Sequence, residues 1–156
     1  MSDTISDYRI EKVRRTVEVT LTNGHRLDGD VFVKTANRFR SGPEEPLDLL
    51  NDDEPFLPLV LTTGAAYLVQ KAQISVVGTR LPQGDDMMDP AVVGMKVELT
   101  LIDGSTHLGS IFPDVRADRP RLIDALNTSL PFLALFAADQ LRLVNRRHIA
   151  YVRPVT

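Results

Sequence analysis

The sequence predicts an all-β protein made of two tandem small β-barrel repeats, each with one short helix, related by a pseudo-twofold. Two observations support this fold class. An alternating apolar and polar run that ends in a glycine turn occurs twice, at 17–24 (VEVTLTNG) and at 97–104 (VELTLIDG). Landmarks further along the two halves then recur at a nearly constant spacing. Self-similarity at a fixed period is the sequence signature of a repeated structural unit.

The spacing between equivalent positions changes only at loops, where insertions and deletions are tolerated. Gly104 follows Gly24 by 80 residues. Asp124 follows Asp48 by 76 residues, and the closing strands are separated by 75. The recurring structural markers are Gly24, Gly29, Asp48, Asn51, Gly104, Gly109, Asp124 and Asn127. We interpret this regularity as a duplication.

The first repeat opens with a predicted hairpin. Apolar residues alternate with polar ones over 17–22, which is typical of a strand with one buried face. Asn23-Gly24 favours the positive φ angles of a type I′ turn. The return strand is expected over 25–34, and Gly29 inside it indicates a bulge or a sharp bend.

The rest of the first repeat is a short helix followed by three strands. The helix is expected over 47–51. The strand at 55–61 contains two prolines, which favour an edge or a strand start over a central position. Strands at 67–69 and 74–77 complete the repeat, and the second repeat follows the same order.

The predicted organisation is a lead-in at 1–13, a first repeat at 14–79, a linker at 80–93 and a second repeat at 94–156. One repeat of this size buries little hydrophobic core, so each repeat is expected to pack against the other repeat or against another chain. Two side-by-side barrels and one shared unit are both compatible with the pattern.

Composition narrows the class of protein. The chain has 43% hydrophobic and 25% charged residues, a net charge of −3 and no cysteine. A mildly acidic balance argues against broad non-specific nucleic-acid binding, and the lack of cysteine excludes disulfides and thiolate sites. The polar N-terminus has no signal-peptide layout, and the apolar stretch 130–138 is too short to span a bilayer. We therefore expect a cytoplasmic, bacterial-like protein with no membrane association.

The opening hairpin, 17–31, and the closing stretches, 68–77 and 143–152, resemble the Sm-like family and its bacterial Hfq-like members. The resemblance implies small Sm-like or Src-homology-3-like barrels. Hfq-like proteins carry a Lys-His pair before the last strand that contributes to uridine binding. The matching positions here are Lys71-Ala72 and Arg146-Arg147, so the basic residue is kept and the histidine is not. The resemblance therefore favours the fold over RNA binding.

A basic group near the ends of the closing strands is the leading candidate for a ligand or partner site. Its members are Lys71, Arg142, Arg146, Arg147 and His148. Two such strand ends, if superimposed, would hold phosphate or an acidic partner. The alternative is a solvated turn with surface charges, which is the more common meaning of a charge run.

The recurring Asp48 and Asp124 have two interpretations. Carboxylates can serve as acid/base groups or cation ligands. Their position on a short helix followed by a Pro-Phe-Leu strand favours hydrogen bonding at helix ends and turns instead. The three histidines have no metal-ligand spacing, and no phosphate loop or catalytic arrangement is present. The sequence thus predicts no enzyme, no metal and no cofactor.

The most apolar stretch is 131–138, and its counterpart is 55–61. Both contain more apolar residues than strict alternation would give, which indicates that both faces of these strands are covered. The candidate docking residues are Phe56, Phe132 and Phe136. We therefore expect a non-enzymatic binding or adaptor protein that acts through a protein partner or self-association. An Sm-like RNA-binding regulator that uses the basic residues is the alternative, with RNA as the less favoured partner.

Overall fold

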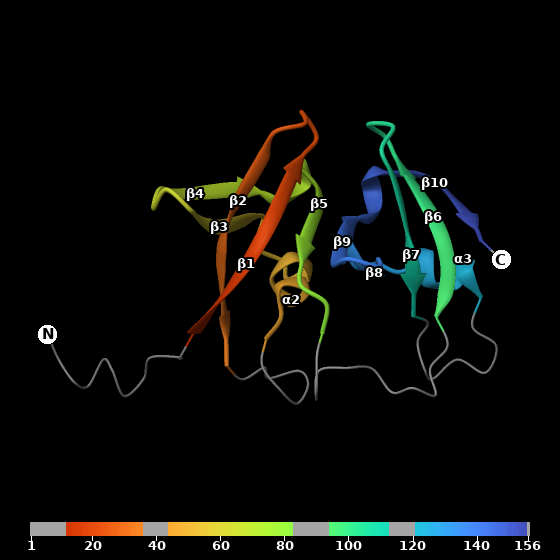
Figure 1. The fold of residues 1–156 in the computed structure, drawn as a ribbon, viewed down its shortest axis with the longest axis horizontal. Helices are drawn as coiled ribbons and strands as arrows, with labels where there is room; N and C mark the ends of the chain where they lie inside the picture. Colours follow the sequence, from red (N-terminus) through yellow and green to blue (C-terminus); the bar gives the residue numbers. More distant parts are fainter. Residues whose placement is uncertain (1–11, 36–43, 83–93, 113–120, 156) are drawn as a thin grey trace, which may run out of the picture.

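The computed structural model describes residues 12–35, 44–82, 94–112 and 121–155. These residues form ten antiparallel strands in one sheet, with two short α-helices (Figure 1). The strands are β1 (Lys12–Leu21), β2 (Arg26–Lys34), β3 (Phe56–Leu61), β4 (Ala66–Gln70), β5 (Ile74–Thr79), β6 (Met95–Leu101), β7 (Thr106–Ile111), β8 (Phe132–Phe136), β9 (Leu141–Asn145) and β10 (Ile149–Pro154). The helical elements are α2 (Pro46–Asn51), α3 (Leu122–Leu126) and the 3-10 turns η1 (Lys71–Gln73) and η3 (Arg146–His148). The predicted all-β class is confirmed.

The strand order is β10-β6-β7-β8-β9-β5-β1-β2-β3-β4, and β9 and β5 join the two halves of the sheet. Here the first half is residues 12–82 and the second half is residues 94–155. Within each half the last strand lies beside the first, and the others follow in chain order. The sheet does not close, so two separate closed barrels are not observed. Strands β4 and β10 are its free edges.

The two halves share an internal register. In the first half β5 pairs with β1 through Val19↔Val77, and the register shifts between Thr20 and Leu21. In the second half β10 pairs with β6 through Leu99↔Val152, with a shift between Ile149 and Tyr151. The shift falls at equivalent places, because Leu21 pairs with Ile74 as Leu101 pairs with Ile149.

The three glycine turns are of one kind, and it is not the predicted type I′. Gly24, Gly64 and Gly104 have positive φ, and no other type of residue in the described ranges does. The N–H of Gly24 donates to the carbonyl of Leu21, and the N–H of Leu21 donates to the carbonyl of His25. A type I turn followed by a left-handed glycine has this pattern. Asn23 therefore stays in the ordinary region, and only the glycine needs positive φ.

The mid-strand glycines permit a close backbone crossing. The sequence predicted a bulge or a sharp bend at Gly29, and β2 pairs with β1 through Gly29 with no register shift, so this pair has no bulge there. A Cβ on Gly29 would lie 2.3 Å from the carbonyl oxygen of Val60, and one on Gly109 would lie 2.7 Å from that of Phe136. The absence of a side chain lets β3 and β8 turn sharply across β2 and β7.

The prolines of 55–61 indicated an edge or a strand start: Pro55 stands directly before the first residue of β3, but β3 is not an edge strand. It lies between β2 and β4, but its pairing with β2 covers only Gly29↔Leu61 and Asp30↔Val60. Pro58 pairs with Leu68 of β4 and has no partner on β2. Its missing N–H therefore breaks no ladder bond on the β2 side.

Two hydrophobic cores lie along the sheet. The first contains Val17, Val19, Val31, Val33, Leu50, Leu57, Leu59, Val69, Ile74, Val77, Phe132 and Leu143. The second contains Val97, Leu99, Leu101, Ile111, Leu135 and Val144. Two members of the first core, Phe132 and Leu143, come from the second half of the chain. The first half is therefore completed by β8 and β9.

Two predicted segments fall largely outside the described residues: 1–11 of the lead-in and 83–93 of the linker. Strand β1 begins at Lys12, two residues before the predicted start of the first repeat. Within the described ranges no helix is both long and apolar enough to cross a membrane.

Candidate functional site

The basic residue Lys71 is buried in a structural role. Its Nζ donates to the carbonyl oxygen of Leu49 and lies 2.5 Å from Oδ1 of Asp52. Only 7% of the residue is exposed. Lys71 is the first residue of η1, and its ammonium group bonds a backbone carbonyl near the C-terminal end of α2, where a positive charge is favourable.

Arg146 has the same structural role in the second half, where it bonds a carbonyl of α3. Its Nε donates to the carbonyl of Leu130 at 2.8 Å, and its Nη1 donates to the carbonyl of Leu126 at 3.3 Å. Leu126 is the last residue of α3. The two predicted strand-end cations therefore hold the two short helices, and their charges face backbone carbonyls.

His148 lies at the junction between the halves and is 8% exposed. Its Nε2 lies 3.0 Å from the carbonyl oxygen of Ala72, and its Nδ1 lies 3.3 Å from Oγ of Ser75. A carbonyl can only accept, so Nε2 carries the proton. Beside it, Asn145 donates from Nδ2 to the carbonyl of Ile74 at 2.9 Å. These polar contacts join the two halves in addition to the backbone pairing of β5 with β9.

Arg142 belongs to a chain of polar contacts over the β6–β7 turn. Its Nη1 lies 3.0 Å from Nδ1 of His107, whose Nε2 lies 3.2 Å from Oγ of Ser105. Ser105 Oγ donates to Asp103 Oδ1 at 2.7 Å. Burial, and then the nearby Arg142 charge, lower the pKa of His107. The hydrogen bonds from Ser105 lower the pKa of Asp103.

The direction of these hydrogen bonds determines their chemistry. A guanidinium only donates, so Nδ1 of His107 accepts and Nε2 holds the ring proton. The hydroxyl proton of Ser105 is directed at Asp103, not at His107. A nucleophilic serine needs its proton taken by the imidazole, which is the reverse arrangement. This network therefore suits turn stabilisation.

Arg147 is the exposed member of the basic group. Its backbone N–H donates to Oδ1 of Asn145 at 3.1 Å. The other four members are directed into separate structural contacts in the two halves and at their junction. The structure thus does not gather the five residues into one binding surface.

The recurring acidic residues Asp48 and Asp124 make hydrogen bonds at the N-terminal ends of α2 and α3. Asp48 Oδ2 accepts from the N–H of Glu45 at 2.7 Å, as part of a capping box on α2. Asp124 accepts from Nε of Arg121 at 2.9 Å, and this hydrogen bond lowers its pKa. In the described ranges no three acidic or histidine side chains are grouped to hold a metal ion.

The recurring asparagines are used differently in the two halves. Asn51 Oδ1 accepts from the N–H of Phe132 at 2.8 Å, and its Nδ2 donates to the carbonyl of the same residue at 3.1 Å. Asn51 of the first half thus holds the backbone of β8 from the second. Asn127 is exposed, and its side chain has no hydrogen bond to the part of the chain that the structure describes.

The three candidate docking phenylalanines have three environments. Phe132 is buried in the first core. Phe136 is half-buried and packs edge-on against Phe112, with ring centroids 5.0 Å apart. Phe56 is 48% exposed at the start of β3. Of the three, Phe56 is therefore the most available for docking.

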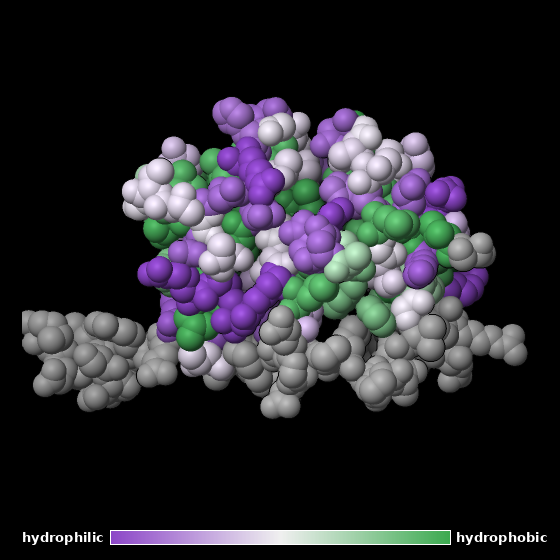
Figure 2. All heavy atoms as spheres, viewed as in Figure 1, coloured by the Kyte–Doolittle hydropathy of each residue, from purple (hydrophilic) through white to green (hydrophobic). Residues whose placement is uncertain are grey.

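The free edges carry apolar side chains that sequence reasoning did not single out. Tyr67 and Leu68 on β4 are 47% and 73% exposed, and Tyr151 on β10 is 64% exposed. Hydrophobic atoms show at both ends of the molecule in Figure 2. The sequence signal for Leu68 was its equivalence to Leu143, but only the structure shows that one is covered and the other is not.

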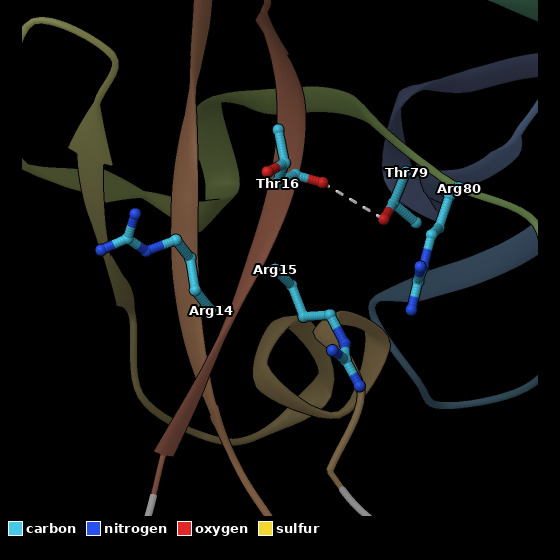
Figure 3. Close-up of a pocket in the computed structure, with 5 residues that line it drawn as sticks. All are labelled: Arg14, Arg15, Thr16, Thr79 and Arg80. Atoms are coloured by element: carbon cyan, nitrogen blue, oxygen red, sulfur yellow. Dashed lines mark hydrogen bonds between the residues drawn. The ribbon is translucent and has the colours of Figure 1, made fainter.

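Sequence reasoning also missed a cluster of three arginines where β1 and β5 separate (Figure 3). Arg14, Arg15, Thr16, Thr79 and Arg80 line a shallow cavity of about 220 Å³. Arg14 contacts Asp30 at 3.5 Å. Arg15 and Arg80 extend toward one side in Figure 3 and have no carboxylate partner in the described ranges. Their signal was the Arg14-Arg15 pair near the start of β1.

No protein-family model, curated protein or solved structure matches this chain.

Proposed function

We propose that this protein is a non-enzymatic binding or adaptor module that acts through protein–protein contacts at the free edges of its sheet. We further propose that the sheet consists of two tandem small barrel-like repeats of the Sm-like or Src-homology-3-like kind. The observation that carries the proposal is the junction inside the chain. There, one half covers the other by strand pairing, while the equivalent surface at β3 and β4 is uncovered.

Strand addition is the mechanism that fits this surface. An exposed sheet edge offers backbone N–H and C=O groups to an added strand, and side chains beside the edge provide specificity. Natural proteins usually blunt long apolar edges, because such edges promote association. Strand β4 instead presents Tyr67 and Leu68, with Phe56 on the adjacent strand. These side chains are suited to a partner that supplies a strand and an apolar contact.

The test is capture of binding partners by the immobilised full chain from a lysate of the source cells. Proteins enriched by the wild type should be lost with Leu68→Lys, because a charge would enter the contact. They should be retained with Leu108→Lys, since Leu108 is also an exposed leucine (58%) but lies on the interior strand β7. The same enriched set with both variants would contradict binding through the β4 edge.

RNA binding is the second candidate, and Arg15 and Arg80 are the observation that favours it. Unpaired arginines next to a cavity can contact phosphate oxygens. A filter-binding series with a uridine-rich RNA should show affinity that falls as salt rises, and that weakens in Arg15→Ala with Arg80→Ala. The exposed Arg147 gives a comparison variant, Arg147→Ala. Absence of binding at low salt would remove this candidate.

A further inference from the structure

The ladder between β1 and β5 in the first half ends earlier than its counterpart in the second half. The pairing of β1 with β5 ends at Gly78. In the second half β6 and β10 stay paired one residue further, and the N–H of Val155 then donates to the carbonyl of Lys96 at 2.9 Å. The positions equivalent to Lys96 and Val155 are Thr16 and Arg80. The first half therefore has an opening where the second half has a closed ladder.

The junction between the halves accounts for this opening. The last two residues of β5 stay paired with β9, through Gly78↔Arg142 and Thr79↔Leu141. Strand β10 is an edge of the sheet and has no such neighbour on its other side. Strand β5 therefore follows β9 and leaves β1. The hydroxyl of Thr79 donates to the carbonyl of Thr16 at 3.4 Å, at the point where the two strands part.

The opening has arginines where the second half has apolar residues. Arg15 and Arg80 line the cavity of about 220 Å³, and their equivalents are Met95 and Val155. Arg15 lies on the same face of β1 as the buried Val17, because side chains alternate along a strand. A guanidinium on a core-facing position loses part of its hydration and requires a compensating partner. The two halves have thus diverged in charge at this point of a shared scaffold.

Two of the three arginines at the opening have uncompensated charges. Arg14 contacts Asp30 at 3.5 Å, and its guanidinium carbon lies 5.9 Å from the centroid of the Phe32 ring. In Figure 3 Arg14 points away from the opening, whereas Arg15 and Arg80 extend to the same side of it. Neither Arg15 nor Arg80 has a carboxylate partner among the described residues. The opening therefore holds two positive charges.

A backbone donor lies at the closed end of the opening. The N–H and the carbonyl of a residue in an antiparallel strand point to the same side of that strand. The carbonyl of Thr16 faces β5, since it accepts from Thr79, so the N–H of Thr16 faces β5 as well. Within the described parts of the chain this N–H has no acceptor, because β5 has already left β1.

We infer that this opening binds a small phosphomonoester dianion through Arg15, Arg80 and the N–H of Thr16. Guanidinium groups donate paired N–H···O bonds to phosphate oxygens. A phosphomonoester carries a charge of about −1.5 to −2 at pH 7 and three acceptor oxygens, which match two arginines and one N–H. A phosphodiester of RNA carries one charge and matches less well. The site lies away from the free edges, so the inference goes beyond the proposed function.

The cavity volume limits the size of the ligand. Sites for drug-sized molecules have volumes of about 300–1,000 Å³. The opening, at about 220 Å³, is smaller. It accommodates a phosphate group with a short chain attached, such as a phosphorylated three-carbon compound.

The experiment is calorimetric titration of the full chain with glycerol 3-phosphate at low, constant ionic strength. Wild type should bind at one saturable site. Arg15→Met and Arg80→Val introduce the residues that the second half has, and each should raise the dissociation constant about 10-fold or more, because charge-assisted bonds are lost. Arg147→Met removes an exposed arginine from η3 and should leave the dissociation constant within about 2-fold of wild type.

Dimethyl phosphate and a uridine-rich RNA distinguish a phosphomonoester from a nucleic-acid backbone. Dimethyl phosphate has one charge, so it should bind about 10-fold more weakly than glycerol 3-phosphate or worse. If dimethyl phosphate or the RNA binds as tightly as glycerol 3-phosphate, and does so through Arg15 and Arg80, the inference is overturned in favour of RNA.

Two other results also overturn the inference. One is the absence of saturable binding by wild type up to about 10 mM glycerol 3-phosphate. The other is equal weakening by Arg147→Met, since overall charge would then determine binding. Circular dichroism must show that the variants are folded, and Arg80→Val changes an exposed residue, so it decides the test if Arg15→Met unfolds. Partner capture with Leu68→Lys concerns another surface, so either proposal can fail while the other holds.

Discussion

Phe132→Ala tests how the two halves depend on each other. Phe132 belongs to β8 in the second half, yet it is 2% exposed within the first core. Its backbone is held on both sides by Asn51 of α2. The substitution would empty a phenylalanine-sized volume between the halves, and the surrounding strands are fixed by pairing.

Truncation of a fully buried phenylalanine to alanine costs about 3–5 kcal/mol of unfolding free energy. Phe132→Ala should fall in that range in a urea titration. Phe56→Ala is the matched control, because it is the equivalent residue and is 48% exposed. At a concentration where the chain is monomeric, Phe56→Ala should cost about 1 kcal/mol or less.

Hydrogen exchange locates the damage. Because Phe132 belongs to the same core as Val17 and Val31, its loss should speed exchange of amides in β1 and β2 of the first half. Equal costs for Phe132→Ala and Phe56→Ala would refute the reasoning. So would faster exchange confined to the second half, since Phe132 would then support only its own repeat.

Three further predictions follow from single contacts. Gly29→Ala should lower the free energy of unfolding by about 1–3 kcal/mol, because the new Cβ would meet the backbone oxygen of Val60. Gly78→Ala should lower it less, because its Cβ would meet the flexible side chain of Gln140. Equal urea midpoints for the two variants would contradict this. Lys71→Met should lower the free energy of unfolding by about 1–3 kcal/mol, because it leaves the Leu49 carbonyl without its hydrogen bond. Arg147→Met, at an exposed position, should change it by no more than about 0.5 kcal/mol. Thermal melts that show the reverse order would contradict this. The pKa of His107 is lowered from 6.5 on folding, so its contribution to stability is full above pH 6.5 and falls as the pH drops through that value. His107→Gln should therefore destabilise the protein less at about pH 5 than at about pH 8, and a pH-independent effect in urea titrations would show that His107 is not desolvated.

Local patterns were sufficient for much of the fold. Alternation over 17–22 and the glycine after it identified the opening hairpin, because strand period and turn conformation depend on neighbouring residues. The common register of β1–β5 and β6–β10 was not predicted, because the spacing of equivalent positions does not say which strands pair. The type I′ turn was wrong because Asn23 alone does not distinguish it from a type I turn with a following glycine.

The candidate site was less predictable, because its residues depend on contacts between distant segments. Leu68 and Leu143 stand in similar local sequences, so no local pattern distinguishes the exposed one from the buried one. Only the pairing of β9 with β5 determines which is covered. Lys71 and Arg146 read as free strand-end charges, but nearby helix carbonyls accept their hydrogen bonds. Those carbonyls are brought close by tertiary packing.

Disulfide cross-linking tests the central claim most directly, which is that strands β5 and β9 join the two halves of the chain. The sequence has no cysteine, so Thr79→Cys with Leu141→Cys places the only two thiols at paired positions of these strands. Mild oxidation followed by peptide mass spectrometry should find position 79 joined to position 141 within one chain. Thiols that stay free, or links between different chains alone, would contradict the pairing of β5 with β9.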